Sequence, residues 1–333
     1  MKNKTVKMII RAIFCLLLLT VVILALLGLQ HLLKNSQEKK NQTMTTATEQ
    51  KAVTEEPVST EENVIEQVQP ETEMETETET ETETETEAVT LQNPVIPNVE
   101  ALDNTSQGWG MGPTRDELNR PVDALSYQEK YAGYSVDFIK PTEEKVIYLT
   151  FDEGYEYGMT AQILDTLKEK NAPAVFFVTK PYAESSPELV RRMIDEGHVV
   201  GNHTVHHPSS GMPSLSITDQ TNEIMETDAY LKENFGYSMS LFRYPTGQFS
   251  EQSLAVVNNC NYRSVFWSFA YKDWDVNNQP DETESLNLLL QKVHPGAIYL
   301  LHAESQTNTN ILGSFIDAVR AQGYTIGVYT DTL

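Results

Sequence analysis

The chain has 333 residues, of which 40% are hydrophobic and 22% are charged. It contains 24 Lys and Arg residues against 48 Asp and Glu residues, so its formal net charge is −24 at pH 7. Nucleic acids and anionic lipid surfaces bind basic protein surfaces, and this balance therefore excludes both as partners of the folded part. Of the two cysteines, Cys15 lies in an N-terminal apolar run, so Cys260 has no disulfide partner in the folded domain.

Residues 1–33 predict a cytoplasmic tail and a signal-anchor transmembrane helix. Several Lys and Arg residues precede the apolar run 12–29, in which Thr20 is the one polar residue. This run is long enough to span a bilayer and longer than the apolar core of a cleaved signal peptide. The basic residues before it favour a cytoplasmic N-terminus. The chain is therefore expected to be a single-pass protein of the cell membrane, with its remaining residues outside the cytoplasm and facing the cell wall.

Residues 34–104 predict a disordered acidic linker. This segment is rich in Thr and Glu and contains an alternating Glu-Thr repeat at 75–87. Such a composition buries too little apolar surface to offset chain entropy, and its like charges keep it extended. The predicted linker would hold the folded domain, residues 105–333, at some distance above the membrane.

The folded domain shows alternating strand and helix patterns, which predict an α/β fold with parallel strands in an open sheet or a barrel. In both architectures the active site is formed by the loops that follow the strands. Strands are expected at 146–151, 174–179, 199–201, 262–267, 297–301 and 325–328, and helices at 160–169, 187–196, 218–233, 250–259, 284–293 and 308–322.

Polar residues follow several of these strands. His203 and His207 are four residues apart, and one helical turn would place both imidazoles on a single face. Two neutral imidazoles and a carboxylate suit a divalent metal such as zinc; the alternative is a histidine cluster on a polar loop. Of the adjacent acids Asp152 and Glu153, one can bind the metal while the other takes a proton from water. The alternative for this pair is a solvated acidic turn.

Four further residues are candidates for the same site. His302 follows an apolar strand and can protonate a leaving amine, or it can hydrogen-bond to backbone. Arg243 can orient a catalytic carboxylate through its fork of donors, or it can form a surface ion pair. Asp273 can hold His302 in the useful tautomer or cap a turn. Trp274 offers an aromatic surface for a sugar ring.

Taken in order, these segments resemble the polysaccharide deacetylase domain (NodB homology, carbohydrate esterase family 4) over about residues 105–333. Within the family, the sequence is similar to the delta-lactam-biosynthetic de-N-acetylases. The segments that support this closer resemblance are GWG at 108–110, YLTFDEGYEYG at 148–158, VFWS at 265–268 followed by DW at 273–274, and HPGAIYLLH at 294–302.

The resemblance implies a distorted (β/α) barrel that hydrolyses N-acetyl groups of a glycan. Glu153 stands where the family has an aspartate, and its side chain is one methylene longer. The roles implied by the family motifs are general base for Asp152, metal ligands for Glu153, His203 and His207, tether of the base for Arg243, an acid pair for Asp273 and His302, oxyanion donor for the backbone N–H of Thr246, and substrate contacts for Tyr244 and Trp274.

The resemblance also implies a cofactor and a substrate. The cofactor is one divalent metal, with zinc favoured over cobalt or manganese. The substrate is a peptidoglycan glycan strand, with N-acetylmuramic acid favoured and N-acetylglucosamine or another glycan as the alternative. A catalytically silent wall-binding module is the rival from another class, and the retained set of catalytic residues argues against it. A metallopeptidase is disfavoured because no His-Glu-x-x-His motif is present. The protein is expected to be monomeric and to touch the membrane through its N-terminal helix alone.

Overall fold

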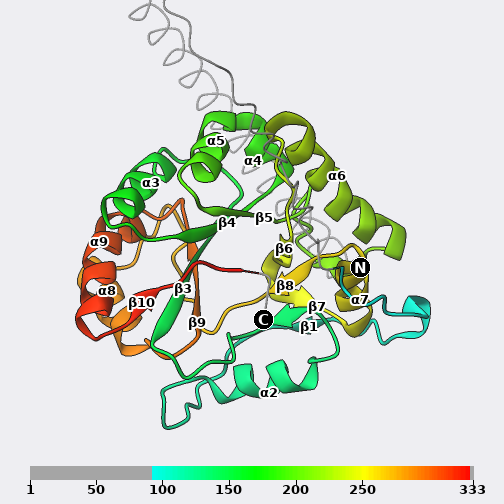
Figure 1. Ribbon diagram of the computed structural model, residues 1–333, viewed down its shortest axis with the longest axis horizontal. Helices are drawn as coiled ribbons and strands as arrows, with labels where there is room; N and C mark the ends of the chain where they lie inside the picture. Colours follow the sequence, from blue (N-terminus) through cyan, green and yellow to red (C-terminus); the bar gives the residue numbers. More distant parts are fainter. Residues whose placement is uncertain (1–91, 331–333) are drawn as a thin grey trace, which may run out of the picture. The chain divides into compact units, whose positions relative to one another are not determined.

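The computed structural model describes residues 92–330, which form an α/β fold with a curled parallel sheet at its centre (Figure 1). The predicted transmembrane helix and most of the predicted linker lie outside the described residues. The strands of the sheet are β2 (Val136–Asp137), β3 (Val146–Glu153), β4 (Ala174–Val178), β5 (Val199–Asn202), β6 (Leu241–Phe242), β8 (Arg263–Val265), β9 (Ala297–His302) and β10 (Thr325–Ile326).

The strand order across this sheet is β10-β3-β4-β5-β6-β8-β2, and β9 also pairs with β3. Every one of these pairings is parallel. The sheet curls into a half-barrel, and the carboxyl ends of its strands therefore meet along one rim. The two short strands β1 (Gln107–Gly108) and β7 (Gln248–Phe249) form a separate antiparallel pair.

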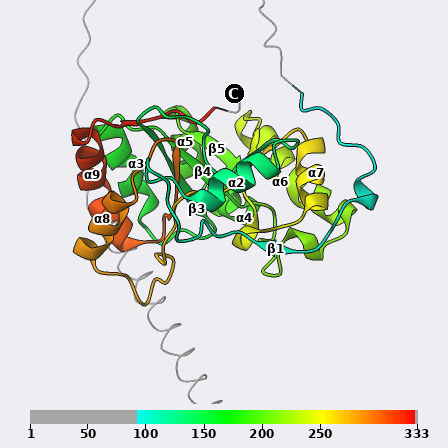
Figure 2. The same ribbon diagram turned by 90° about the horizontal axis from the view of Figure 1, so that it is seen from below.

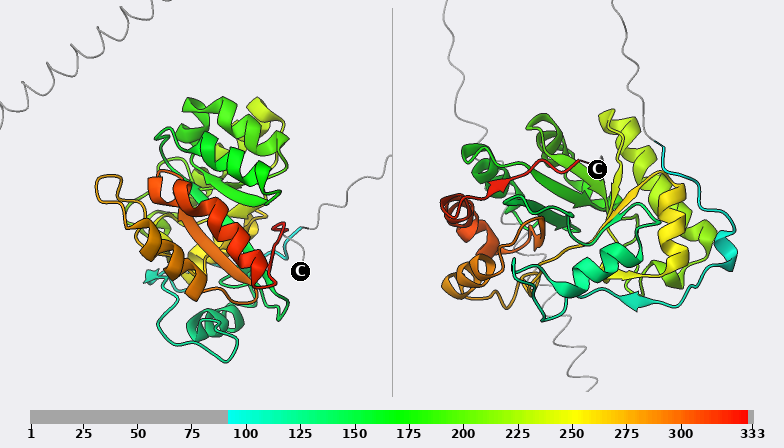
Figure 3. Two further views of the ribbon diagram at one scale, coloured as in Figure 1. Left: turned by 90° about the vertical axis from the view of Figure 1, so that its left-hand side faces the viewer. Right: turned by 60° about the horizontal axis from the view of Figure 1, so that its bottom comes forward.

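Helices surround the sheet on its outer side (Figure 1). Helices α8 and α9 pack side by side on one flank, and α6 and α7 lie on the opposite flank (Figures 2 and 3). Within residues 92–330, no helix combines the length and the apolar character needed to cross a membrane. The helices are α2 (Val122–Lys130), α3 (Thr160–Glu169), α4 (Lys180–Ser185), α5 (Pro187–Asp195), α6 (Ile217–Phe235), α7 (Glu251–Asn259), α8 (Glu282–Gln291) and α9 (Gln306–Ala321).

The core has two parts because side chains alternate across each strand. On β4, Phe176 packs toward the helices in the larger apolar cluster, whereas Val175 and Phe177 belong to a smaller cluster. Strand β4 is buried on both faces, as expected for a parallel strand covered on both sides. The small cluster contains side chains from β4, β6, β8 and β9, together with Tyr329, whose hydroxyl donates a hydrogen bond to Asp137.

The elements predicted from hydrophobic periodicity are all present. Each of the six predicted strands and six predicted helices has a counterpart whose ends lie within two residues of the predicted bounds. The α/β prediction with parallel strands is therefore confirmed, and the barrel takes the form of a curled half-barrel. Strands β1, β2 and β7 and the six-residue helix α4 lie outside the predicted elements, because segments this short show little periodicity. Helix α2 was also not predicted, although its nine residues equal the length of α5 and α7.

The folded part begins before the predicted boundary at residue 105. Asn93 donates side-chain hydrogen bonds to the carbonyls of Asn258 and Tyr262, and the backbone N–H of Ile96 donates to the side chain of Asn259. Residues 92–104, assigned to the linker by composition, thus pack along α7, from its end at Asn258 to its start at Gln252. This stretch lacks the Glu-Thr repeat of the linker. Its folded state depends on hydrogen bonds to residues more than 150 positions away, which local composition does not reveal.

Candidate active site

Strand register brings the candidate residues to one rim of the sheet. In the β3–β9 pair, Asp152 lies opposite His302. In the β5–β6 pair, Asn202 lies opposite Phe242, so the residues that follow, His203 and Arg243, leave the sheet side by side. Four segments that are distant in the sequence therefore meet at the carboxyl ends of the strands, where α/β proteins build their sites.

Arg243 holds Asp152 from inside the half-barrel. Its guanidinium is fully buried and lies 4.1 Å from the centre of the Phe177 ring. Its Nη1 donates to Asp152 Oδ1 at 2.9 Å and to Thr150 Oγ1 at 2.7 Å. Burial raises the pKa of Asp152, but the charge of Arg243 opposes it, and the resulting pKa lies below the ordinary value. Asp152 is therefore a carboxylate at neutral pH, able to accept a proton.

His203 is fixed in one tautomer. Its Nδ1 lies 2.9 Å from the carbonyl oxygen of Arg243, and since a carbonyl only accepts, Nδ1 carries the proton. The lone pair on Nε2 is then free, and this nitrogen lies 3.6 Å from Asp152 Oδ2. Burial lowers the pKa of His203 to about 4, so the ring is neutral at pH 7 and its contact with Asp152 is no ion pair.

His207 lies beside His203, with 4.8 Å between the ring centres. Burial lowers the pKa of His207, so the two rings form a neutral pair. The predicted helical turn between them is wrong: the segment is a loop in which Thr204 has φ 75° and His207 has φ 46°. Left-handed backbone at a β-branched residue is strained, and such strain is typical of functional loops.

Glu223 on α6 secures this strained loop and was not singled out from the sequence. Its Oε2 accepts hydrogen bonds from the backbone N–H groups of Val205 and His206, and its Oε1 lies 2.7 Å from His206 Nδ1. His206 is thereby directed away from the histidine pair. The local sequence around His206 does not indicate this partner, because Glu223 lies 17 positions further along the chain.

His302 and Asp273 form the second half of the site. Asp273 is fully buried, and its Oδ1 lies 2.7 Å from His302 Nδ1. Its Oδ2 accepts from the backbone N–H of His302 and from Asn308 Nδ2 at 2.6 Å, a contact that sequence reasoning missed. Burial lowers the pKa of His302, but the negative charge of Asp273 and its hydrogen bond outweigh this and raise it to about 9. His302 is therefore a cation at neutral pH.

Glu153 does not join the two histidines. Strand β3 continues through Glu153, so the alternation of side chains persists and sends Glu153 away from the side that Asp152 faces. Its buried carboxylate lies 3.4 Å from Thr160 Oγ1. Burial, followed by the charges of Glu156 and Glu304, raises its pKa well above the ordinary value. Across residues 92–330, no three His, Cys, Asp or Glu side chains are grouped closely enough to hold a metal.

The predicted oxyanion donor and the two predicted substrate contacts have different placements. The ring of Trp274 is half exposed and lies 5.6 Å from that of His302, which suits contact with a substrate. Thr246 lies in a tight turn with φ 58°, another strained β-branched residue, and its role as an oxyanion donor stays a prediction. Tyr244 is buried and stacks on Phe266, 5.2 Å away, so its ring faces the core and this placement does not support a substrate contact.

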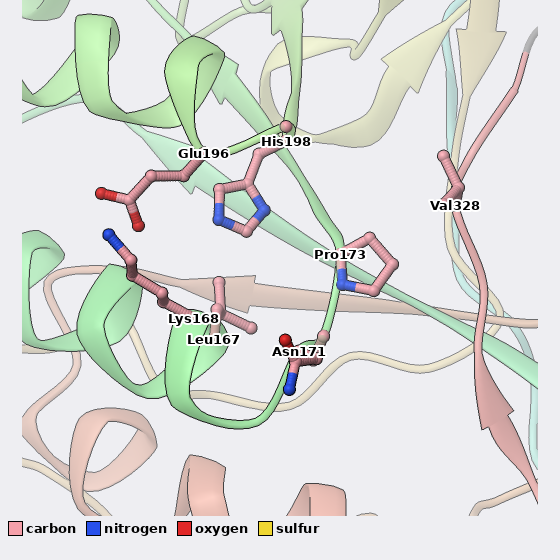
Figure 4. Close-up of a pocket in the computed structure, with 9 residues that line it drawn as sticks. Leu167, Lys168, Asn171, Pro173, Glu196, His198 and Val328 are labelled. Atoms are coloured by element: carbon pink, nitrogen blue, oxygen red, sulfur yellow. The ribbon is translucent and has the colours of Figure 1, made fainter.

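A pocket at the opposite end of the sheet is separate from this site. It lies at the amino ends of β4 and β5, where Pro173 and His198 precede the two strands (Figure 4). His198 Nδ1 accepts a hydrogen bond from the backbone N–H of Ala174, so its ring links the two strand starts. None of the predicted catalytic residues lines this pocket.

The geometry defines a class of reaction. A carboxylate base, a pair of neutral imidazoles and a protonated imidazole meet at one rim, which is what amide or ester hydrolysis requires: one group to activate water and another to protonate the leaving group. The site and the fold therefore define a hydrolase of the general acid–base type, built at the rim of a parallel sheet.

Comparisons with known proteins identify the family. Residues 139–265 match the family model described as polysaccharide deacetylase. The chain is 38% identical over 242 residues to the peptidoglycan-N-acetylmuramic acid deacetylase PdaA of Bacillus subtilis, covering 70% of this chain and 88% of that protein. It is 33% identical over 203 residues to a peptidoglycan-N-acetylglucosamine deacetylase of Bacillus cereus, covering 60% of this chain and 71% of the relative.

The solved structure of Bacillus subtilis PdaA, a family 4 carbohydrate esterase, agrees with this match. It superposes with a TM-score of 0.62 and 35% sequence identity, covering 68% of this chain and 95% of that structure. The chain belongs to the polysaccharide deacetylase family, whose members are carbohydrate esterases that act as N-deacetylases. The family resemblance drawn from the sequence is thereby confirmed.

Proposed function

We propose that this protein removes N-acetyl groups from the amino sugars of peptidoglycan, with N-acetylmuramic acid as the favoured unit. The observation that supports this most directly is the pairing of Asp152 with His302 across β3 and β9, which sets an anionic base and a cationic acid at one site. The relative with 38% identity is named as an N-acetylmuramic acid deacetylase, and the one with 33% identity as an N-acetylglucosamine deacetylase. N-acetylglucosamine is therefore the second candidate.

The chain's own residues divide the reaction between them. Asp152, held as a carboxylate by Arg243, accepts a proton from the attacking water as the water oxygen bonds to the acetyl carbon. His302, held as a cation by Asp273, gives its proton to the amide nitrogen as the C–N bond breaks. The products are acetate and the free amine of the sugar. The proposed donor to the developing oxyanion is the backbone N–H of Thr246, a residue that lies in a strained turn.

Deacetylases of this family are metal-dependent in general. His203 and His207 fit as nitrogen ligands, because both rings are neutral and the Nδ1–H of His203 is anchored on a carbonyl, which leaves Nε2 for a cation. A bound divalent ion, with zinc favoured over cobalt or manganese, would supply Lewis-acid polarisation of the carbonyl and of water. Glu153 as a third ligand stays a prediction that its contact with Thr160 does not support.

The predicted anchor sets where this chemistry takes place. The apolar run 12–29 and the acidic repeat 75–87 support a single-pass membrane protein with its catalytic domain outside the cytoplasm, facing the cell wall. The protein would act there as a monomer, with the glycan strand as its partner.

Mass spectrometry of peptidoglycan fragments tests the proposal. Purified full-length chain with added zinc is incubated with glycan fragments that carry or lack stem peptides. The expected result is loss of acetyl groups from muramic acid units. Loss from N-acetylglucosamine units instead would establish the second candidate, and glycan binding without any loss would establish the wall-binding module.

A further inference from the structure

Within residues 92–330, the exposed Tyr and Trp rings lie on two loops at the active-site rim. Among residues 92–330, the large aromatic side chains that are exposed are Tyr155 at 76%, Tyr157 at 53% and Trp274 at 50%. The two tyrosines follow β3, the strand that carries Asp152, and Trp274 directly follows Asp273. No other Tyr, Trp or Phe ring is exposed in this part of the chain, and the exposed imidazoles of His206 and His207 lie on the loop after β5.

Glu156, which lies between the two tyrosines, is fixed against the protein by its own hydrogen bonds. One carboxylate oxygen of Glu156 accepts hydrogen bonds from the backbone N–H groups of Gly158 and Met159, and the other accepts from the hydroxyl of Tyr182 at 3.2 Å. Gly158 has φ 85°, a conformation that favours glycine and turns the chain into α3. Glu156 is thus fixed toward the protein, and its two neighbours project into solvent.

Both loops are close to the reacting groups. Tyr155 is three residues beyond Asp152, so its Cα lies within about 11 Å of the Cα of Asp152. Tyr157, five residues beyond, lies within about 18 Å. On the other side, the Trp274 ring contacts that of His302 at 5.6 Å. Sugar units next to one whose acetamide lies between Asp152 and His302 would fall within these limits.

The chemistry of the rings selects the ligand. The faces of a pyranose ring carry C–H groups, which pack against aromatic faces, and a tyrosine hydroxyl remains free to hydrogen-bond. The stem peptides of peptidoglycan carry carboxylates, and the acidic side chains of Glu156, in the same loop as the tyrosines, and of Glu304 oppose their approach. Neutral sugar units of the glycan backbone therefore fit these rings better than anionic peptide.

We infer that Tyr155 and Tyr157 bind the sugar units next to the one that is deacetylated. This inference rests on the proposed function and names two specificity-determining residues for it. Glu156 is a positioning residue, since it fixes the tyrosines through its own hydrogen bonds and faces away from the solvent that the glycan occupies.

The test measures acetate release by the full-length chain from N-acetylated peptidoglycan fragments of one, two and four sugars. For Y155A/Y157A, kcat/KM on the four-sugar glycan is expected to fall on the order of 3- to 10-fold per ring, mainly through KM. The loss should shrink as the substrate shortens. Y155F/Y157F keeps both rings, and its KM should be close to that of the wild type. Met225→Ala, which truncates an exposed side chain on α6, serves as the matched control and should match the wild type.

The outcomes separate this inference from the proposed function. If the wild type releases acetate and Y155A/Y157A loses the same factor on every substrate length, or nothing at all, the tyrosines bind no neighbouring sugar. If the wild type releases none, the proposed function fails, and calorimetric titration of the four-sugar glycan into the same variants still decides the inference. Equal affinity of wild type and Y155A/Y157A in that titration would overturn it.

Discussion

The coupling between Asp273 and His302 gives the most quantitative prediction. Asp273→Asn removes the charge but keeps the shape of a side chain that accepts from His302 and Asn308. The rise in the pKa of His302 from 6.5 to about 9 corresponds to roughly 3 kcal/mol in favour of the protonated ring. Without the charge of Asp273, burial acts against only the weaker effects of Asp152 and Glu304, and the pKa of His302 is expected to fall to its ordinary value of 6.5 or below.

The sign of the effect on stability follows from the same shift. Because folding raises the pKa of His302, the protonated ring stabilises the folded state fully below about pH 6.5, and this contribution is lost as pH rises through 9. Asp273→Asn should therefore lower the melting temperature most at neutral and acidic pH and least above pH 9.

Activity should fall with the fraction of protonated His302. A pKa at the ordinary value of 6.5 leaves about one ring in four protonated at pH 7, so kcat/KM should fall at least about fourfold, and further if the ring loses its orientation. NMR titration of labelled histidines, together with kcat/KM between pH 5 and 10, measures both effects. Asp275→Asn, on the same loop and paired with Lys272, is the control. A His302 resonance that still titrates near pH 9 in Asp273→Asn would refute the reasoning.

Three further predictions concern the other half of the site. Arg243→Met should cost about 3–5 kcal/mol of unfolding free energy and raise the pKa of Asp152, because it leaves a buried carboxylate unpaired; chemical denaturation and the acid limb of the pH profile measure both. A chelator should abolish acetate release and zinc should restore it, and calorimetry should show weaker zinc binding in His203→Ala; unchanged zinc affinity would remove His203 from the ligand set. At pH values above about 4.5, Glu153→Gln should raise the melting temperature, because folding raises the pKa of Glu153 and its ionisation then destabilises the fold. A loss of zinc affinity in that variant would restore Glu153 as a ligand.

The regular elements were predictable because their apolar spacing is local. The 146–151 pattern already indicated a buried strand, and the helix at 160–169 was placed at its observed bounds. The pairing of Asp152 with His302 could not be predicted, because the register between residues 150 positions apart depends on the whole sheet. The sequence located both residues at strand ends, and the fold supplied their proximity.

The incorrect predictions for Glu153 and for the His203–His207 segment have a common cause. In each case, regular backbone ends one or two residues away from where the sequence pattern places its end. Strand β3 runs two residues beyond its predicted end, and this extension turns Glu153 away from Asp152. The spacing of His203 and His207 suggested a helix, but left-handed backbone at Thr204 and His207 brings the rings together in a loop. Such conformations depend on partners like Glu223, which no local pattern reveals.

The central claim is that Asp152 activates water for removal of an acetyl group, and acetate release tests it most directly. Full-length wild type, Asp152→Asn and the control Met225→Ala are each incubated with zinc and purified glycan strands, and acetate is measured over time. We expect release by the wild type and by Met225→Ala, and a fall of at least about 100-fold in Asp152→Asn, since a neutral amide cannot take the proton. Equal release by Asp152→Asn and wild type would contradict the claim.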